Sequence, residues 1–393
     1  MELESIFEVI LSRHREKSGQ ENVTLETIHT DYLRTEPLIS IIYIVVIVIT
    51  AVIGLFGNIL IIGAVCVHRK LRTTGNLFIV NLAIADLVVV SIIQPFTIIG
   101  VVSGPQFFIN REELCHLVST ICVMSCASSM ITLSAIALNR YIFVCKNKYY
   151  DTIYTSRTTP LMCIGIYLIV FLTDLPNFLG WGGHTYDFKT MGCSFDRLAS
   201  LSYTLFLSIT IYWIPFILVM FCYIAIYLYV RKTRKLLKTT LDKSSSSNDL
   251  LLEARRQENI RMVRTFFIVV VCFLLCWTPY DLLILVDRND SAPKLLYVIL
   301  LAIGHSNSSL NSILYGATNK RFRKGYKQFL CMVFCGQNGE QYNSSPLVAS
   351  YASTHSNYNA NTCAANGKLG KSTSSLNVSN SKLNKVEKEQ RYS

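Results

Sequence analysis

The chain has few charged side chains for its length. Only 16% of its 393 residues are charged, whereas 51% are apolar. A soluble chain of this size normally carries more charge, and its apolar runs are shorter. The scarcity of charge therefore argues against an ordinary soluble globular protein.

Several sequence signals are missing as well. The chain shows neither an internal repeat nor the paired broken apolar segments that secondary transporters commonly have. It lacks a His-Glu zinc motif and a Gly-x-Ser-x-Gly turn, so it offers no catalytic pair for an intramembrane enzyme. The first 37 residues contain no apolar signal-peptide core. These absences disfavour a transporter, a channel or an enzyme, and we expect the first apolar run to act as an uncleaved insertion signal.

Long apolar runs are what the chain does have. A helix of about 20 apolar residues crosses a bilayer, and seven runs are near or above that length. We therefore predict an all-α membrane protein, a bundle of seven transmembrane helices. The runs cover residues 38–67, 76–103, 113–145, 158–180, 199–230, 262–287 and 293–317.

Basic residues gather on one side of the predicted bundle. They follow the first, third, fifth and seventh runs and precede the sixth, and the net charge is +12. Positively charged loops stay in the cytoplasm, so we expect the N-terminus outside and the C-terminus inside. This distribution predicts a multi-pass protein of the plasma membrane and disfavours a nucleic-acid partner. The basic residues include Arg69, Lys70, Arg72, Lys146, Lys148, Arg157, Arg231, Lys232, Arg255, Arg256, Arg261, Arg264, Arg321, Arg323, Lys324 and Lys327.

Two parts of the predicted organisation lie outside the cell or within the membrane. Residues 1–37 are expected to form an extracellular tail, and residues 38–317 the seven-transmembrane domain. Asn22-Val23-Thr24 in the tail is a glycosylation sequon, which agrees with the predicted topology.

The remaining two parts follow the last apolar run. Residues 318–335 have aromatic residues on one helix face and basic residues on the other, which predicts an amphipathic eighth helix in contact with membrane lipids. Cys331 and Cys335 in that segment are candidates for palmitoylation. Residues 336–393 are rich in Ser, Asn and Lys and are predicted to be a disordered cytoplasmic tail.

Five polar side chains fall inside the apolar runs at similar depth. Asp86 lies about ten residues into the second run, which is ~15 Å along a helix and near the bilayer centre. Asn307 and Asn311 are four residues apart and share one helix face. Isolated polar groups are costly in a bilayer, so we predict that they meet Ser129 and Asn58 in one mid-membrane cluster. For Asn58 a structural hydrogen bond between helices is the expected role.

The chain has thirteen cysteines, and most lie inside the apolar runs. Cys115 and Cys193 are different because both fall on the predicted outer side, where disulfides persist. The others inside the runs are expected to be free and packed as small apolar groups, namely Cys66, Cys122, Cys126, Cys163, Cys222, Cys272 and Cys276.

Taken together, these residues resemble the rhodopsin-like (class A) G-protein-coupled receptors over about residues 40–335. The resemblance is specific because seven short motifs occur in the right order on the seven runs. They are Gly57-Asn58, Leu82-Ala83-x-Ala85-Asp86, Cys115 with Cys193, Asn139-Arg140-Tyr141, Pro215 with Tyr223, Cys276-Trp277-x-Pro279, and Asn311-x-x-x-Tyr315.

Within that family the chain is most similar to the melatonin receptors. The sequence of their seventh transmembrane span is close to Asn307-Ser308-x-Leu310-Asn311-x-Ile313-x-Tyr315-Gly316. Asn139 in place of the usual acid is also shared with them, as is Leu175-Pro176-Asn177. The resemblance implies a receptor, and no enzyme, that binds an extracellular small-molecule agonist and activates a heterotrimeric G protein, with the inhibitory class favoured.

The resemblance also assigns roles to residues away from the ligand. It implies a disulfide between Cys115 and Cys193, which are the only cysteines expected near the outer surface. No other cofactor is implied beyond an allosteric sodium ion, for which carboxylate, hydroxyl and amide oxygens suit a hard cation. The tail, with its serines, suggests arrestin and receptor kinases as further partners. The sodium set is Asp86, Ser129, Asn307 and Asn311, and the G-protein coupling set is Asn139, Arg140, Tyr141, Tyr223 and Tyr315.

The ligand pocket departs from the melatonin-receptor pattern. Melatonin receptors have a histidine in span five that is associated with ligand binding, and the aligned residue here is Ile211. A pocket glutamine of those receptors is replaced by Arg197, and a span-six asparagine is replaced by Asp281. Asp281 has two interpretations: it pairs internally with Arg197 or His305, or it meets a cationic or multiply hydrogen-bonding ligand. The predicted pocket residues are Asn177, Phe195, Arg197, Asp281, Cys122, Trp277 and His305.

An opsin-like receptor is the alternative function. Opsins bind retinal through a lysine in span seven, and the aligned position here is His305. The lysine at that end of the span, Lys294, falls at the outer rim. A chain of this kind would hold retinal only without a covalent bond.

Overall fold

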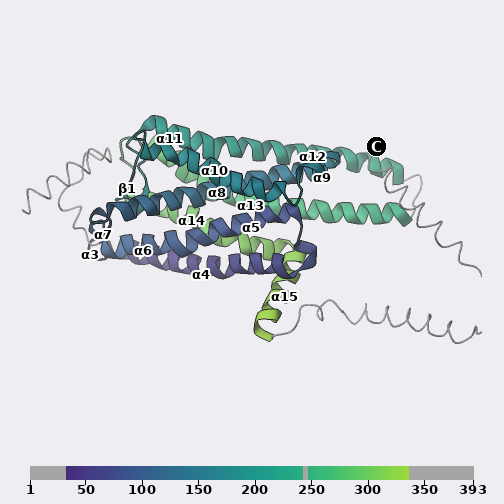
Figure 1. The fold of residues 1–393 in the computed structure, drawn as a ribbon, viewed down its shortest axis with the longest axis horizontal. Coiled ribbons are helices and arrows are strands. Elements are labelled where there is room, and N and C mark those ends of the chain that lie inside the picture. The colour runs from purple at the N-terminus through teal and green to yellow at the C-terminus, as the bar shows by residue number, and fades with distance from the viewer. Residues whose placement is uncertain (1–31, 242–246, 336–393) are drawn as a thin grey trace, which may run out of the picture.

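The computed structural model describes residues 32–241 and 247–335, which form one bundle of long helices (Figure 1). Six helical segments in this part of the chain are long and apolar enough to cross a membrane. They are α4 (Pro37–Val67), α5 to α6 (Thr74–Ser103), α8 (Glu112–Cys145), α10 (Thr158–Phe178), α11 to α12 (Leu201–Thr233) and the Val263–Val286 part of α13 (Ser247–Val286).

The seventh helix of the bundle is α14 (Lys294–Thr318). It is long enough to span a bilayer, but it carries His305, Asn307, Asn311 and several serines, which lower its apolar character. All of these polar side chains except Ser306 are buried, so α14 turns its polar face into the bundle. The predicted seven-helix architecture is therefore confirmed.

Two of the spanning segments contain a π-helical turn. In the second, η2 (Val89–Ile93) separates α5 (Thr74–Val88) from α6 (Gln94–Ser103). In the fifth, η4 (Ser208–Trp213) separates α11 (Leu201–Leu207) from α12 (Ile214–Leu241). In the fifth span the π-helical turn η4 lies just before Pro215 and buries Ser208 and Tyr212 in the bundle. Single π-helical turns of this kind often mark functional sites.

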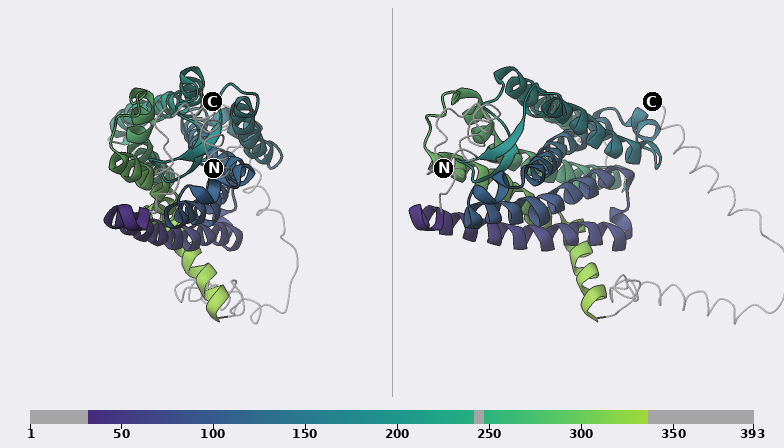
Figure 2. Two further views of the ribbon diagram at one scale, coloured as in Figure 1. Left: turned by 90° about the vertical axis from the view of Figure 1, so that its left-hand side faces the viewer. Right: turned by 60° about the vertical axis from the view of Figure 1, so that its left-hand side comes forward.

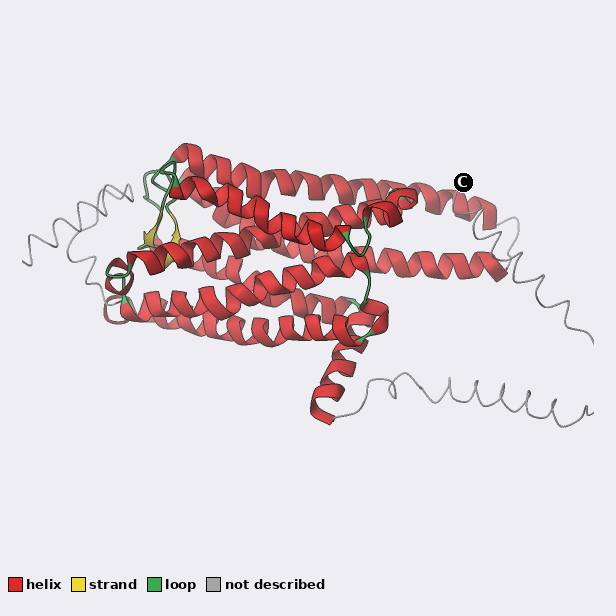
Figure 3. Cartoon of the chain, viewed as in Figure 1, coloured by secondary structure: helices red, strands yellow, loops and turns green. Residues whose placement is uncertain are grey.

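A β-hairpin closes one end of the bundle. Strands β1 (His184–Asp187) and β2 (Gly192–Phe195) pair antiparallel, with Tyr186 opposite Cys193 (Figure 3). Cys193 forms a disulfide with Cys115 near the start of α8, with Cα atoms 5.3 Å apart, so the predicted pairing is confirmed. Because the disulfide joins β2 to a spanning helix, the hairpin is held across one end of the bundle. We call that end of the bundle the hairpin end.

Short elements connect the long helices and continue the chain after them. α3 (Tyr32–Thr35) precedes α4, and the connections are η1 (Arg69–Leu71), α7 (Gln106–Ile109), η3 (Asn147–Tyr149) and α9 (Tyr150–Ile153). After α14, α15 (Lys320–Cys335) turns away from the bundle axis at the end opposite the hairpin (Figures 1 and 2). Phe322 of α15 stacks on Tyr315, with ring centroids 5.1 Å apart, which anchors α15 to the bundle.

The side chains that face outward from the bundle are apolar. On α10, for example, Ile164, Leu168 and Phe171 are each more than a third exposed. Burying such a surface in lipid removes it from water, at about 25 cal/mol per Å² of apolar area. The chain is therefore a multi-pass membrane protein.

Candidate functional site

A cavity of about 130 Å³ lies inside the bundle just below the hairpin. Its walls come from α8, α11, η4, α13 and α14, and residues of β2 cover it. Five of the seven predicted pocket residues line it: Phe195, Cys122, Trp277, Asp281 and His305. The other lining residues include Cys126, Thr204, Ser208, Ile211, Tyr212 and Tyr280.

Asp281 is the acidic group of this cavity. Ser208 donates a hydrogen bond to the carboxylate, with Oγ 2.9 Å from each oxygen, and Asp281 is 8% exposed. Neither Arg197 nor His305 is its partner, so both predicted internal pairs are wrong. Within the described residues the carboxylate has no ion-pair partner. The side chains of Ser208 and Trp213 are its hydrogen-bonding neighbours, and they leave part of its acceptor capacity free.

His305 and Trp277 lie side by side on the cavity wall. Their ring centroids are 5.9 Å apart, and Tyr280 lies 6.2 Å from Trp277 on the other side. Gly304 permits this packing, because a Cβ there would come within 3.2 Å of the indole. His305 is 3% exposed, and neither of its ring nitrogens has a hydrogen-bond partner among the described residues.

Asn177 is placed differently from the prediction. Its side-chain amide donates to Asp174 at 2.9 Å and to the Tyr203 hydroxyl at 2.7 Å, and it lies 3.3 Å from His184. His184 in turn lies 3.2 Å from the Asp174 carboxylate. Asn177 therefore belongs to a buried polar cluster between α10 and the hairpin, and it does not line the cavity.

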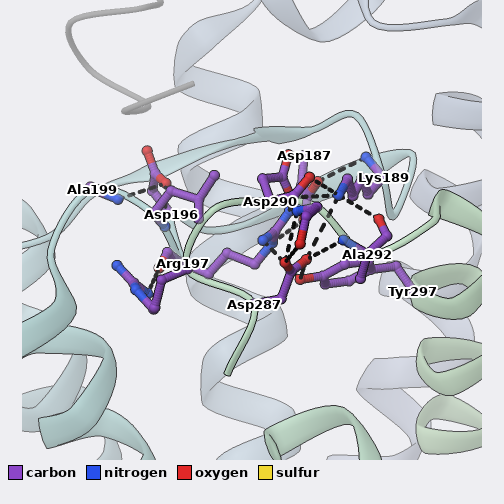
Figure 4. Close-up of polar contacts among 12 residues, drawn as sticks. Asp187, Lys189, Asp196, Arg197, Ala199, Asp287, Asp290, Ala292 and Tyr297 are labelled. Carbon is purple, nitrogen blue, oxygen red and sulfur yellow. Dashed lines mark hydrogen bonds and ion pairs between the residues drawn. The ribbon is translucent and has the colours of Figure 1, made fainter. Parts of the chain in front are cut away.

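Arg197 is also absent from the cavity wall, because acidic residues hold it above (Figure 4). Its Nε lies 3.1 Å from Asp187, its Nη2 2.5 Å from Asp290, and its Nη1 donates to the Tyr297 hydroxyl at 3.0 Å. Lys189 extends the network, with Nζ 2.9 Å from Asp290. The network ties the hairpin to the loop between α13 and α14, and sequence analysis missed it.

Asp287 is held as an anion in the same network. Partial burial works against its charge, but backbone amides of Ala292 and Ser291 and the Tyr297 hydroxyl donate to it. The hydrogen bonds prevail and lower the pKa of Asp287 to about 2. A clue was present in the sequence, since Asp287 and Asp290 form an acidic pair that needs cations nearby.

Asp196 is the titrating group of the hairpin end. Burial raises the pKa of Asp196 to about 7, although the amides of Leu198 and Ala199 donate to its Oδ1. Its other oxygen, Oδ2, has no hydrogen-bond partner in the described part of the chain. A protonated carboxyl suits this position better than an ionised one.

Asp196 therefore predicts a pH dependence of stability. Its folded-state pKa lies above the unfolded value of about 4, so its favourable contribution is complete below that pH and is lost as pH rises through about 7. Asp196→Asn cannot ionise and should raise the thermal unfolding temperature by about a few degrees near pH 8, and by less near pH 5. Purified protein in detergent, scanned at both pH values, provides the measurement. An equal effect of the substitution at the two pH values would contradict this assignment.

Three residues of the predicted mid-membrane cluster, Asp86, Asn311 and Ser129, are in contact. Asp86 is fully buried, Asn311 Nδ2 lies 2.6 Å from its Oδ2, and Ser129 Oγ lies 3.5 Å from its Oδ1. Asn58 donates to the Ser308 carbonyl oxygen at 2.8 Å, which confirms the predicted bond between helices. The side-chain oxygens of Asn307 and Asn311 are buried, and in the described residues neither has a hydrogen-bond partner.

Arg140 lies at the opposite end of the bundle and is 6% exposed. Its guanidinium carbon is 4.3 Å from the centre of the Phe266 ring, and Nη2 lies 3.4 Å from Asn76 Oδ1. Phe266 also contacts Tyr315, with ring centroids 5.9 Å apart. Arg140 belongs to the predicted coupling set, but in this arrangement its side chain is packed inside the bundle. Stacking on Phe266 provides the physical reason.

The other predicted coupling residues surround Arg140. Asn139 donates to the Tyr150 hydroxyl at 3.4 Å, and Tyr141 packs against Phe221. The hydroxyls of Tyr223 and Tyr315 are buried, and within the described ranges they have no hydrogen-bond partner. A partner group inserted at this end of the bundle could form hydrogen bonds with these two hydroxyls.

The remaining predicted residues lie at the ends of the chain. Asn22 falls outside the described residues. Cys331 is half-buried and Cys335 is the last residue of α15. Lys294 lies at the hairpin end, where Nζ is 3.0 Å from Glu36, and it does not line the cavity, which disfavours an opsin-like bond to retinal.

Comparison with known proteins places this arrangement in a family. The family model described as 7 transmembrane receptor (rhodopsin family) matches residues 57–315. The chain belongs to this family and is a rhodopsin-like (class A) G-protein-coupled receptor. Squid rhodopsin shares the fold, with a TM-score of 0.63 and 20% identity over 76% of this chain and 88% of that chain.

Curated relatives refine the comparison. The chain is 33% identical to the Homo sapiens melatonin receptor type 1B over 291 residues, which is 72% of this chain and 77% of that protein. It is 32% identical to the Danio rerio melatonin receptor type 1B-B over 74% of this chain and 81% of that protein. The chain is 30% identical to the Mus musculus melatonin receptor type 1A over 72% of this chain and 79% of that protein. The chain is thus a receptor similar to the melatonin receptors.

Proposed function

We propose that this receptor binds an extracellular small molecule in the cavity below the hairpin and activates an inhibitory-class heterotrimeric G protein. The observation that supports this best is the cavity itself, which joins Asp281 and Trp277 under a disulfide-anchored cover. At the other end of the bundle, Arg140, Tyr223 and Tyr315 form the buried cluster at which a G protein would bind. Binding that favours one helix arrangement would shift the population at both ends together.

The relatives are named for melatonin, and the cavity supports a related but more polar ligand. Phe195, Trp277 and Tyr280 offer flat apolar surfaces that suit an aromatic ring. Asp281, with Ser208 and Trp213 beside it, adds an acceptor that carries a negative charge when it is ionised. A buried carboxylate is stable only when it is paired. We infer an aromatic ligand that carries a cationic amine or several hydrogen-bond donors.

A sodium ion fits the mid-membrane cluster. Asp86 and Ser129 supply a carboxylate and a hydroxyl within one buried site. The free oxygens of Asn307 and Asn311 are further acceptors, and unsatisfied buried oxygens are suitable ligands for a hard cation. When bound, the ion supplies a positive countercharge for the Asp86 carboxylate in the bilayer interior.

This assignment predicts that agonist affinity falls as sodium concentration rises. The ion would stabilise the arrangement in which the oxygens converge, and an agonist that favours another arrangement must compete with it. Asp86→Asn removes the charge but keeps the shape, so the sodium dependence should disappear. Agonist affinity measured in sodium and in N-methylglucamine at equal ionic strength tests this. The same sodium response in the variant would place the ion elsewhere.

Other properties complete the proposal. The basic ends of the helices support an orientation with the hairpin end outside the cell, in the plasma membrane. Cys331, next to the exposed apolar Met332 and Val333 of α15, supports attachment of palmitate and contact with lipid. Arrestin and receptor kinases would act on the tail.

The experiment that tests the proposal is nucleotide exchange in lipid vesicles. Receptor and purified inhibitory-class G protein are combined, and neutral indoles such as melatonin are compared with their amine counterparts. We expect compounds with a cationic amine to raise the exchange rate more than neutral ones. If neutral indoles were equally or more potent, the proposed ligand class would be wrong. Exchange that equals receptor-free vesicles for every compound would contradict the proposed function itself.

A further inference from the structure

One wall of the cavity carries a cluster of sulfur and nitrogen atoms that the proposed ligand contacts at Asp281, Phe195 and Trp277 do not use. Sγ of Cys122, Sγ of Cys126 and a ring nitrogen of His305 all lie within 4.8 Å of one another. The two cysteines are four residues apart on α8, so they share a helix face, and His305 faces them from α14. All three residues line the cavity.

His305 provides an independent observation that points to a bound group. The imidazole is 3% exposed, and within the described residues no hydrogen bond of standard geometry reaches either ring nitrogen; the Cys122 thiol is an electrostatic neighbour of the ring. Leaving buried polar nitrogens unsatisfied is costly, and each such case in a native protein calls for an ion, a water or a function. The nearest groups with matching chemistry are the two thiols.

We propose that Cys122, Cys126 and His305 bind a zinc-class transition-metal ion on the wall of the ligand cavity. Two thiolates and one imidazole form a set that zinc uses when it keeps a fourth position open. Thiolate ligands disfavour Na⁺, Mg²⁺ and Ca²⁺, which prefer oxygen, so this site is chemically distinct from the sodium site. The fourth position faces the cavity, where water or a donor atom of a small molecule completes the tetrahedron.

The geometry requires only a small adjustment. With metal–sulfur bonds of about 2.3 Å, two ligand sulfurs in a tetrahedron are about 3.8 Å apart. Ligand atoms that already lie within 4.8 Å of one another therefore need to approach by about 1 Å at most. Rotation of the cysteine side chains provides such a shift without moving either helix, because both Sγ atoms sit one bond beyond Cβ.

Charge balance also favours the ion at this depth. An isolated divalent cation or an isolated thiolate is costly inside a bilayer. One divalent ion with two thiolates and a neutral imidazole has no net charge. Binding releases the two thiol protons, so affinity should rise with pH. The ion would join α8 to α14 on the cavity wall, beside Trp277.

Cobalt is the probe for the test, because Co²⁺ adopts the same tetrahedral site and is coloured. Full-length receptor in lipid nanodiscs is titrated with Co²⁺ and then with Zn²⁺. We expect a thiolate-to-cobalt charge-transfer band with tetrahedral d–d bands, saturation at one ion per receptor, and loss of the bands on addition of Zn²⁺. Zn²⁺ should also raise the thermal unfolding temperature and protect the two thiols from alkylation.

Matched variants distinguish this site from other metal-binding groups. Cys122→Ser, Cys126→Ser and His305→Asn should each weaken zinc binding by about 100-fold or more, since even loss of a group that orients a ligand costs 10–100-fold. Cys163→Ser, a half-buried free cysteine on α10, and His116→Asn, near the start of α8, are the controls and should bind as the wild type does. An unchanged unfolding temperature without metal shows that each variant is folded.

Two results would overturn the proposal. One is the absence of a charge-transfer band in wild-type receptor whose free thiols are shown to be reduced. The other is a band that persists in both Cys126→Ser and His305→Asn. Neither result bears on G-protein activation, so the proposed function is tested separately.

Discussion

Replacing Arg140 with alanine is expected to abolish agonist-stimulated nucleotide exchange while the receptor still reaches the cell surface and binds agonist. The guanidinium stacks on Phe266 and makes one long hydrogen bond to Asn76, and no ion pair holds it in the described part of the chain. Because Asn139 replaces the usual acid, little electrostatic energy opposes release of Arg140 toward a partner. The loss should appear as exchange indistinguishable from receptor-free vesicles.

The burial of Arg140 calls for a volume control. Alanine removes a side chain that packs on Phe266, and loss of core contacts can destabilise the fold by itself. Arg140→Met retains an apolar stem of similar length but no charge, whereas Arg140→Lys retains the charge. If coupling depends on the guanidinium, Met should be as inactive as Ala, and Lys should recover only part of the activity. Full exchange by Arg140→Ala or Arg140→Met would show that another group contacts the G protein.

Replacing Asp281 with asparagine should raise the agonist concentration for half-maximal response by about 10-fold or more, equivalent to about 1.4 kcal/mol. The carboxyl group lines the cavity and has no cationic partner among the described residues, so its charge is available to a ligand. Surface expression should remain normal, because no charged partner in the described residues depends on Asp281.

Ser208→Ala is the matched control for Asp281. It removes the hydroxyl that orients the carboxylate but leaves the charge in the cavity. We expect a smaller shift in agonist potency than for Asp281→Asn, with unchanged expression. If Asp281 were structural instead, both variants would express poorly and the agonist potency of the molecules that reach the surface would be normal. Normal expression with normal potency in Asp281→Asn would contradict both roles.

Helix positions followed closely from the sequence because apolar length is a local property. The run predicted at 113–145 is α8 (Glu112–Cys145), and the run at 293–317 is α14 (Lys294–Thr318). The deep polar residues were also predicted to meet, since Asp86 and Asn311 each need a partner inside a bilayer. Those needs can be read from each segment separately.

The pairing of charges at the hairpin end could not be read in this way. Arg197 contacts Asp187 ten residues earlier and Asp290 ninety-three residues later. Which acidic residues pair with Arg197 depends on the hairpin and on the Cys115–Cys193 disulfide, which set the position of the loop in three dimensions. The sequence suggested Asp281 as a partner for Arg197, and only the fold distinguishes that carboxylate, which lies below the hairpin, from Asp290 above it.

Cys126 shows a different limit. It was grouped with cysteines that fill the core, because a cysteine inside an apolar run is most often a small apolar side chain. Its spacing of four from Cys122 was visible, but the approach of His305 from α14 was not. Two cysteines on one helix face indicate a metal site only when a third ligand is known to lie opposite them.

The most direct test of the account is an electron-microscopy structure of the receptor with an activating small molecule and an inhibitory-class G protein. We predict density for the molecule between Phe195 and Trp277, with a donor group at Asp281, and contact between the G protein and Arg140. An agonist bound above the hairpin or on the lipid-facing surface of the bundle would contradict the account.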